Sequence, residues 1–156
     1  GRHDPEIFNV IADYGCPYVL MHSRGNSKTM DSLINYQNLL FDVKNELSNQ
    51  IELALSYGVN NNQIIIDPGL GFAKNEEQNL ILLRNLEEFV LMPYPILVGP
   101  SRKRFIGSVI NETDPNKRVF GMAAVASRCV IAGVRFLRVH DIKQISQVIK
   151  MTMSII

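Results

Sequence analysis

The sequence predicts a parallel α/β fold, in which strands and helices alternate along the chain. Short apolar runs that suit buried strands alternate with longer segments whose apolar side chains recur at helical spacing, and this happens four times in 156 residues. The connections are short and many of them carry Gly or Pro. Alternation with short connections is typical of a parallel sheet covered by helices.

The first unit follows a short amphipathic helix. That helix is expected over residues 4–14, with Asp4 as its N-cap. Residues 17–22 form an apolar run and predict the first strand, and the polar loop SRGNSKTM follows it. Residues 32–57 carry apolar side chains at helical spacing, so a long helix is expected there, and Gly58 ends it.

The second unit has the most distinctive strand. Residues 63–67 contain three consecutive isoleucines, which suit a strand that is covered on both faces. The loop PGLGFAK comes next. A helix is expected over residues 76–91, because Asn75 is a suitable N-cap and two glutamates stand in the first turn.

The last two units complete the pattern. Residues 95–99 predict the third strand, and its loop, PSRKR, opens into a short helix. A long helix is expected over residues 114–132, ended by Gly133. Residues 134–138 predict the fourth strand, and Asp141 is expected to cap a final helix.

The spacing of the strands is compatible with a (βα)8 barrel, but the length is not. Such a barrel needs about 250 residues, so four units in one domain of 156 residues would fill half of it. A half-barrel would leave two apolar strand edges unpaired. The other half therefore exists elsewhere, or two copies close on each other, or the fold is an open doubly wound sheet.

Composition excludes several classes of protein. The chain is 46% apolar and 20% charged, which excludes global disorder. Its net charge of +1 argues against nucleic-acid binding by bulk charge, and no apolar run predicts a membrane span or a signal peptide. The two cysteines, Cys16 and Cys129, make no disulfide framework. We expect reduced thiols and a cytoplasmic protein, with an organelle not excluded.

Basic side chains gather after the predicted strands, where parallel α/β proteins bind their ligands. These four segments hold two histidines, His22 and His140, and only two acids, Asp67 and Asp141. They also hold seven of the sixteen Lys and Arg residues: Arg24, Lys28, Lys74, Arg102, Lys103, Arg104 and Arg138. This cationic rim predicts an anionic substrate or a leaving group that becomes anionic.

The DPGLGF segment has two interpretations. Asp67 closes an apolar strand, so its carboxylate either accepts hydrogen bonds from a planar donor pair of a heterocycle or holds the turn. Gly69 and Gly71 either let a flat ligand approach the backbone or form the strand-to-helix turn. Phe72 either stacks on an aromatic ligand or covers the end of the sheet.

The segments after the third and fourth predicted strands, residues 99–104 and 138–141, indicate anion binding. Three adjacent cations, residues 102–104, oppose the dipole at a helix start unless an anion is present, although a solvated charge run is the alternative. Arg138 and His140 are two residues apart in an extended segment, so they share a face that suits a phosphate. Arg118 is expected to be a surface or ion-pair residue.

Four motifs together resemble dihydropteroate synthase. They are LMHSRG, IIIDPGLGFAKNEEQNLILL, PILVGPSRKRFIG and the run from Arg118 through GMAAVASRCVIAGVRFLRVHD, in this order over nearly the whole chain. The resemblance implies the last four βα units of a TIM-type (βα)8 barrel. It also implies the family's reaction in folate synthesis. That reaction joins p-aminobenzoate to 6-hydroxymethyl-7,8-dihydropterin diphosphate, giving dihydropteroate and diphosphate, and the family is the sulfonamide target.

The resemblance also implies roles for single residues. The pterin would be bound by Asp67, Lys103, Gly99, Met21, Phe72 and Arg138. Ser101 and Arg102 would face p-aminobenzoate, and Arg138 and His140 would hold the diphosphate. Lys103, Arg138 and His140 would be the catalytic residues.

The family's first four strands are not in this sequence. They carry the asparagine associated with Mg²⁺, so no metal ligand is expected here, and the chain alone is expected to be inactive until an N-terminal half completes it. A homodimer is expected from the resemblance. Two alternatives remain: a methyltetrahydrofolate-dependent methyltransferase pterin domain, which the SRK and RVHD motifs argue against, and a non-catalytic half-barrel that serves as a binding or assembly module.

Overall fold

Four parallel strands form the centre of the protein. A computed structural model describes residues 4–156. The strands are β1 (Tyr18–Met21), β2 (Ile64–Asp67), β3 (Leu97–Val98) and β4 (Phe136–Leu137). β1 pairs with β2 and β3 pairs with β4, both in parallel, and a parallel bridge between Ile66 and Ile96 joins the two pairs. The strands therefore follow one another in chain order, and the predicted parallel α/β class is confirmed.

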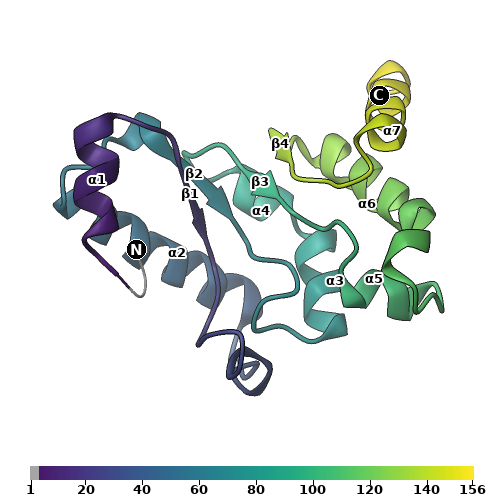
Figure 1. The fold of residues 1–156 in the computed structure, drawn as a ribbon, viewed down its shortest axis with the longest axis horizontal. Coiled ribbons are helices and arrows are strands. Elements are labelled where there is room, and N and C mark those ends of the chain that lie inside the picture. The colour runs from purple at the N-terminus through teal and green to yellow at the C-terminus, as the bar shows by residue number, and fades with distance from the viewer. Residues whose placement is uncertain (1–3) are drawn as a thin grey trace.

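Helices alternate with these strands. They are α1 (Ile7–Tyr14), α2 (Leu39–Ser56), α3 (Glu76–Arg84), α4 (Glu87–Val90), α5 (Arg104–Val109), α6 (Val119–Ala132) and α7 (Ile142–Ser154). Single 3-10 turns cover Met30–Ser32, Asn61–Gln63 and Pro115–Lys117. Figure 1 shows α2 alongside β1 and β2, and α6 and α7 at the opposite end of the molecule. None of the helices in residues 4–156 is long and apolar enough to cross a membrane.

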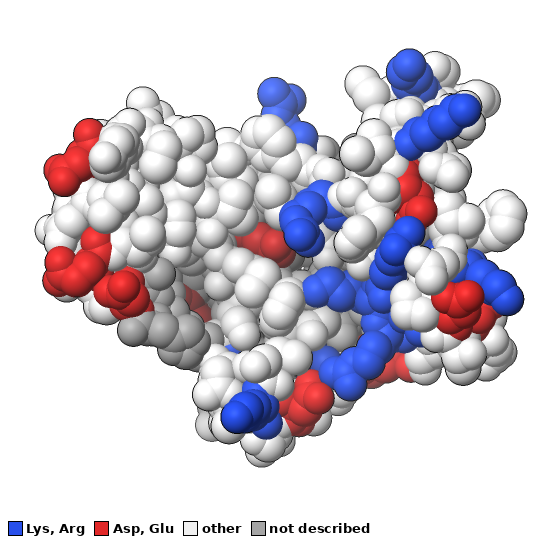
Figure 2. Space-filling model, in the orientation of Figure 1, with Lys and Arg blue, Asp and Glu red and all other residues white. Residues whose placement is uncertain are grey.

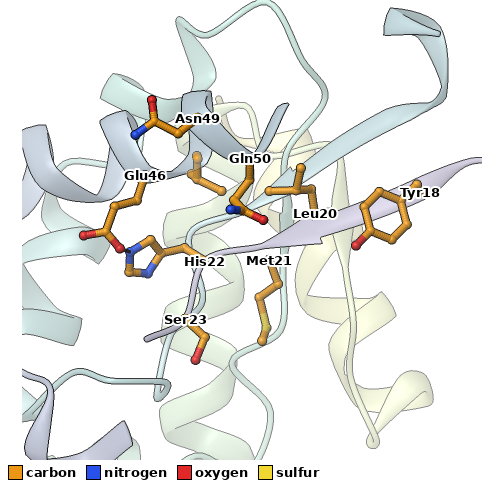
Figure 3. Close-up of a pocket in the computed structure, with 9 residues that line it drawn as sticks. Tyr18, Leu20, Met21, His22, Ser23, Glu46, Asn49 and Gln50 are labelled. Carbon is orange, nitrogen blue, oxygen red and sulfur yellow. Dashed lines mark hydrogen bonds and ion pairs between the residues drawn. The ribbon is translucent and has the colours of Figure 1, made fainter. Parts of the chain in front are cut away.

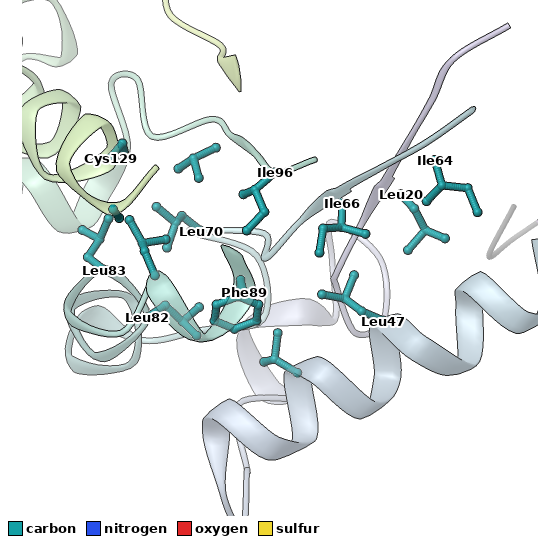
Figure 4. Packing of buried hydrophobic residues seen from close by; sticks show 14 of the residues in the cluster. Leu20, Leu47, Ile64, Ile66, Leu70, Leu82, Leu83, Phe89, Ile96 and Cys129 are labelled. Atoms are coloured by element: carbon teal, nitrogen blue, oxygen red, sulfur yellow. The ribbon is translucent and has the colours of Figure 1, made fainter. Parts of the chain in front are cut away.

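The core lies between the strands and the helices that cover one side of them. Leu47 of α2 and Phe89 of α4 pack with Ile64 and Ile66 of β2, and all four are fully buried (Figure 4). Ile65, which points to the other face of the sheet, is only partly buried. The sequence predicted that both faces of this strand are covered, and this is confirmed for one face only.

Polar side chains move three of the predicted helix boundaries. The helix expected over residues 32–57 begins only at Leu39, because the side chain of Asn38 caps it by accepting the Phe41 N–H at 3.2 Å. The helix expected over residues 76–91 is interrupted at Asn85, whose amide donates to the carbonyl of Ile81 at 2.8 Å.

The helix expected over residues 114–132 begins at Val119. Asp114 caps the preceding 3-10 turn instead, by accepting the Asn116 N–H at 2.9 Å. The predicted glycine ends are confirmed, since Gly15 and Gly133 follow α1 and α6 with left-handed φ of +62° and +87°.

Candidate active site

The carboxyl ends of the four strands bring the predicted loops together at one end of the sheet. Lys and Arg side chains gather over the centre and right of the face drawn in Figure 2. The predicted cations do not all lie free on this rim, however. Arg104 forms an exposed ion pair with Asp31 at 3.1 Å, and Lys74 is buried.

Asp67 is the carboxylate at the centre of this site. It is the last residue of β2 and only 6% exposed, and its Oδ1 accepts the N–H of Gly69 at 2.7 Å. Burial raises the pKa of Asp67 to about 6, and the positive charges of Lys103, Lys74 and Arg138 oppose that rise. The carboxylate thus holds the turn, and the charges of three cations act on it; its hydrogen bonds to a heterocycle stay a prediction.

The two glycines of the DPGLGF segment are required by the protein's own packing. Gly69 has a φ of +69°, and a Cβ there would lie 1.9 Å from the carbonyl oxygen of His22. Gly71 has a φ of +77°, and its Cβ would lie 3.0 Å from Cδ of Lys103. The strand-to-helix turn therefore explains both positions without a ligand.

Lys103 and Phe72 form one wall of an open cleft. The Nζ of Lys103 lies 3.9 Å from the centroid of the Phe72 ring. Burial lowers the pKa of Lys103, and the charge of Asp67 opposes this. Both residues line a cleft of about 770 Å³ together with Arg102. Phe72 also lines an adjoining cleft of about 290 Å³ with Met21. Phe72 thus lies between two predicted residues, with Met21 in one cleft and Lys103 in the other.

Ser101 and Arg102 are tied to the segment that follows β4. The buried Oγ of Ser101 accepts the backbone N–H of His140 at 3.1 Å and lies 2.9 Å from its Nδ1. Arg102, with a left-handed φ of +59°, donates to Asp141 at 3.2 Å. Asp141 does precede α7, but within the described chain its side chain makes no capping hydrogen bond, because Arg102 takes its carboxylate. The expected cap is wrong in that respect.

Arg138 and His140 are exposed two residues apart after β4, as the alternation predicted. The charge of Arg138 acts on both Asp67 and Lys103, which places it at the same site. Among the described residues, the Cβ of Arg138 at 3.9 Å is all that a Cβ added to Gly99 would meet within 4 Å. The backbone in front of Gly99 is therefore open to a ligand.

Arg118 was predicted to be a surface or ion-pair residue, and that prediction is wrong. The side chain is 8% exposed, and its guanidinium donates to the carbonyls of Arg102, Lys103, Glu112 and Thr113 at 2.7–3.3 Å. Gly107 of α5 makes room for it, since a Cβ there would lie 2.3 Å from its Nε. Arg118 therefore holds the backbone of the SRK motif in place through hydrogen bonds to the carbonyls of Arg102 and Lys103.

His22 and Lys74 point inward and form a buried hydrogen-bond network with Glu46, which the sequence did not predict. Nε2 of His22 lies 3.1 Å from Glu46, and Nδ1 lies 2.8 Å from Nζ of Lys74. Figure 3 shows the His22 ring directed at Glu46 of α2. Arg24 donates to the same glutamate at 2.9 Å. The sequence did not predict this network, because Glu46 lies on a helix 24 residues from His22 and no residue spacing links the two.

The described residues do not fit a metal site. No group of three or more His, Cys, Asp or Glu in residues 4–156 could hold a metal ion. Both cysteines of this part of the chain are free thiols, Cys16 exposed and Cys129 buried. Burial raises the pKa of Cys129 to about 12, so this thiol is not a nucleophile at neutral pH.

A buried carboxylate among cations, at the carboxyl ends of parallel strands, defines a ligand site of the kind found in (βα)8 barrel enzymes. Comparison with known proteins identifies the family. The chain belongs to the pterin-binding enzymes, because the model of the family described as "Pterin binding enzyme" matches residues 1–140.

Several relatives carry the name dihydropteroate synthase. The enzyme of a Synechocystis species is 46% identical over 147 residues, which is 94% of this chain and 51% of that protein. The enzyme of Bacillus subtilis is 39% identical over 150 residues, which is 96% of this chain and 50% of that protein. The chain therefore spans about half the length of the curated relatives it matches.

The fold agrees with these relatives. The dihydropteroate synthase of Thermus thermophilus in complex with 4-aminobenzoate superposes with a TM-score of 0.92 at 38% identity, over 97% of this chain and 61% of that one. The predicted fold is confirmed, since the chain matches the C-terminal portion of a pterin-binding TIM barrel.

Proposed function

We propose that this chain supplies the C-terminal half of a dihydropteroate synthase active site. The reaction would join 4-aminobenzoate to 6-hydroxymethyl-7,8-dihydropterin diphosphate and release diphosphate. The observation that carries the proposal is the buried Asp67 at the end of β2, on which the positive charges of Lys103 and Arg138 act. One carboxylate suits the N–H groups of a pterin edge, and the cations suit a diphosphate.

The pterin would bind between Asp67 and Lys103. Asp67 would accept hydrogen bonds from ring N–H groups, and Lys103 would donate to the ring from the other side. The open backbone at Gly99 supports close approach of a flat ring. Phe72 and Met21, which line one cleft, would cover its faces.

The diphosphate would be held by Arg138 and His140. If the hydroxyl of Ser101 donates to Nδ1 of His140, Nε2–H is left to donate to a phosphate oxygen, and the distance of 2.9 Å supports this arrangement. Ser101 would then position His140 in addition to any contact with 4-aminobenzoate. Arg102 lines the larger cleft, which supports its expected role beside that substrate.

The chemistry follows from these contacts. The bond between the pterin methylene carbon and the diphosphate oxygen breaks, and its electron pair leaves with the oxygen. Arg138 and His140 stabilise the charge that grows there. The neutral amine of 4-aminobenzoate attacks the methylene carbon and then loses a proton to solvent, so no strong protein base is required.

The proposed partners are the substrates, the N-terminal half of the barrel and a second copy of the enzyme. The first half would bring the remaining pterin contacts and the ligand for Mg²⁺. Large apolar side chains stand exposed on α6 and α7, which supports a homodimer through these helices: Phe120, Ile131, Met151 and Met153. The two free thiols fit a cytoplasmic location.

The test combines this chain with the first four βα units of the Synechocystis relative. We expect dihydropteroate to form with both parts and not with this chain alone. Arg138→Ala should lower turnover and diphosphate affinity together, whereas Arg135→Ala, an exposed arginine before β4, should change neither. Unchanged diphosphate binding by Arg138→Ala in a calorimetric titration would refute the role of Arg138.

The same experiment separates the alternatives. A methyltransferase pterin domain would bind a pterin without binding diphosphate. A non-catalytic half-barrel would bind neither and would self-associate through its open strand edges, which gel filtration at several concentrations would detect.

A further inference from the structure

Lys74 occupies an unusual place for a lysine, because it is buried at the end of the loop that Asp67 begins. Its side chain lies among three acceptors. Nζ is 3.1 Å from the carbonyl of Gly69, 3.0 Å from the carbonyl of Phe72 and 2.8 Å from Nδ1 of His22. An ammonium group has three N–H donors and no acceptor. The three acceptors around Lys74 therefore match the three N–H donors of its charged form.

Gly69 connects this ammonium to the carboxylate of the site. Its N–H donates to Oδ1 of Asp67 at 2.7 Å, while its carbonyl accepts from Lys74. A Cβ at Gly69 would lie 1.9 Å from the carbonyl of His22, so the residue has no room to shift in that direction. The backbone N–H of His22 in turn donates to the carbonyl of Asp67 at 2.8 Å. The positions of Lys74 and Asp67 are thus linked through the backbone of one residue, Gly69.

His22 must be neutral to accept from Lys74. Burial, reinforced by the charge of Lys74, lowers the pKa of His22 to about 3, although Glu46 opposes the change. With Nδ1 as the acceptor, Nε2 carries the proton and donates to Glu46 of α2 at 3.1 Å. Arg24 holds that glutamate from its other side and stacks on the ring of Tyr36.

Three cations act on Asp67, and they come from three loops. Lys103 precedes α5 and is half-buried, Arg138 follows β4 and is exposed, and Lys74 precedes α3 and is 7% exposed. Burial lowers the pKa of Lys74 to about 7, against the charges of Asp67 and Glu46, while Arg24 and Lys103 add to the lowering. Lys103 lines the larger cleft, Arg138 is exposed, and both are proposed to bind substrate. Lys74 is the remaining cation, and it is buried beside Asp67 without a proposed substrate contact.

We propose that Lys74 is a positioning residue for the pterin site, which acts through Asp67: its ammonium fixes the loop at Gly69 and keeps the Asp67 carboxylate ionised. An ionised carboxylate has two oxygens that accept, whereas a protonated one turns a donor toward the N–H groups of the ring. The assignment of the ring as a pterin rests on the proposed function. The effect of Lys74 on Asp67 does not.

The direct test measures the protonation of Asp67 by NMR in this chain, labelled with 13C at the aspartate carboxyl groups. Lys74→Met keeps the length of the side chain and removes its charge. The titration midpoint of Asp67 should rise by about one pH unit. Lys28→Met removes a charge from an exposed lysine of the same rim and should move the midpoint by less than about 0.2 unit. An unchanged midpoint in folded Lys74→Met would overturn the proposal.

A second measurement needs no variant and so does not depend on the folding of Lys74→Met. The 15N shifts of the His22 ring report which nitrogen carries the proton. We expect the neutral tautomer with the proton on Nε2 from pH 8 to pH 5. The other tautomer, or a charged ring, would overturn the proposal, because Nδ1 could not then accept from Lys74.

Pterin affinity in the completed barrel links the inference to function. Lys74→Met should lose about threefold in affinity near pH 6.5, where most of its Asp67 would be protonated, and almost nothing at pH 8. A loss of the same size at both pH values would indicate a purely structural role and would overturn the proposal. If the unmodified barrel binds no pterin while the Asp67 midpoint still depends on Lys74, the proposed function fails and the inference stands.

Discussion

Replacement of Arg118 should weaken the protein far more than its position near the start of α6 indicates. The guanidinium donates to four backbone carbonyls, those of Arg102, Lys103, Glu112 and Thr113. Methionine in its place would leave these acceptors without their donor. A buried acceptor that loses its partner costs about 1–3 kcal/mol. Since the carbonyls share one donor group and part of them can reach water, we expect a total loss of about 3 kcal/mol in the free energy of unfolding.

Thermal unfolding followed by circular dichroism measures this loss. For a chain of this size, about 3 kcal/mol corresponds to a fall in Tm of roughly 6–12 °C. Arg84→Met is the matched control, because Arg84 makes an exposed ion pair with Glu77 that is worth less than about 1 kcal/mol. A fall of less than about 2 °C in Arg118→Met would refute the reasoning, since it would mean that the four hydrogen bonds add no net stability.

Three further results are expected. Gly69→Ala should prevent folding, because the new Cβ would lie 1.9 Å from the His22 carbonyl, and a soluble variant with native circular dichroism would contradict this. Gly99→Ala should leave Tm within about 2 °C and weaken pterin binding by the completed barrel, because its Cβ meets only Arg138 Cβ, at 3.9 Å, among the described residues. Unchanged affinity would remove Gly99 from the site. Pterin affinity should fall as the pH is lowered through about 6, because burial raises the pKa of Asp67 to that value and only the ionised form accepts two hydrogen bonds; a flat profile from pH 7.5 to pH 5 would contradict this.

The alternation of apolar runs was enough to predict the order of strands and helices. It succeeds because each strand that packs on helices must carry a short apolar run, as Ile64 and Ile66 do. It fails at helix boundaries, where a single side chain decides. Asn38 caps α2 at Leu39 although the apolar spacing begins earlier, at Leu33. Periodicity reports which face is apolar, and it does not report which backbone N–H groups find an acceptor.

The candidate site was partly predictable for a related reason. Asp67 ends a strand and Lys103 and Arg138 follow strands. Parallel strands end together, so the order of the elements was enough to predict that these residues meet. The roles of Lys74 and Arg118 could not be predicted. Both are buried cations whose partners are mostly backbone carbonyls or a residue far away in sequence, and no residue pattern marks a carbonyl that lacks a partner.

The most direct test of the central claim is the formation of dihydropteroate by this chain together with the first four βα units of the barrel. The substrates are 4-aminobenzoate and 6-hydroxymethyl-7,8-dihydropterin diphosphate, and equal amounts of Asp67→Asn serve as the matched control. We predict product and diphosphate in equal amounts with the native chain, and at least a tenfold lower rate with Asp67→Asn, since a charged acceptor is worth about 1.5–3 kcal/mol. A folded, completed barrel that binds no pterin, or one in which Asp67→Asn works at the native rate, would contradict the claim.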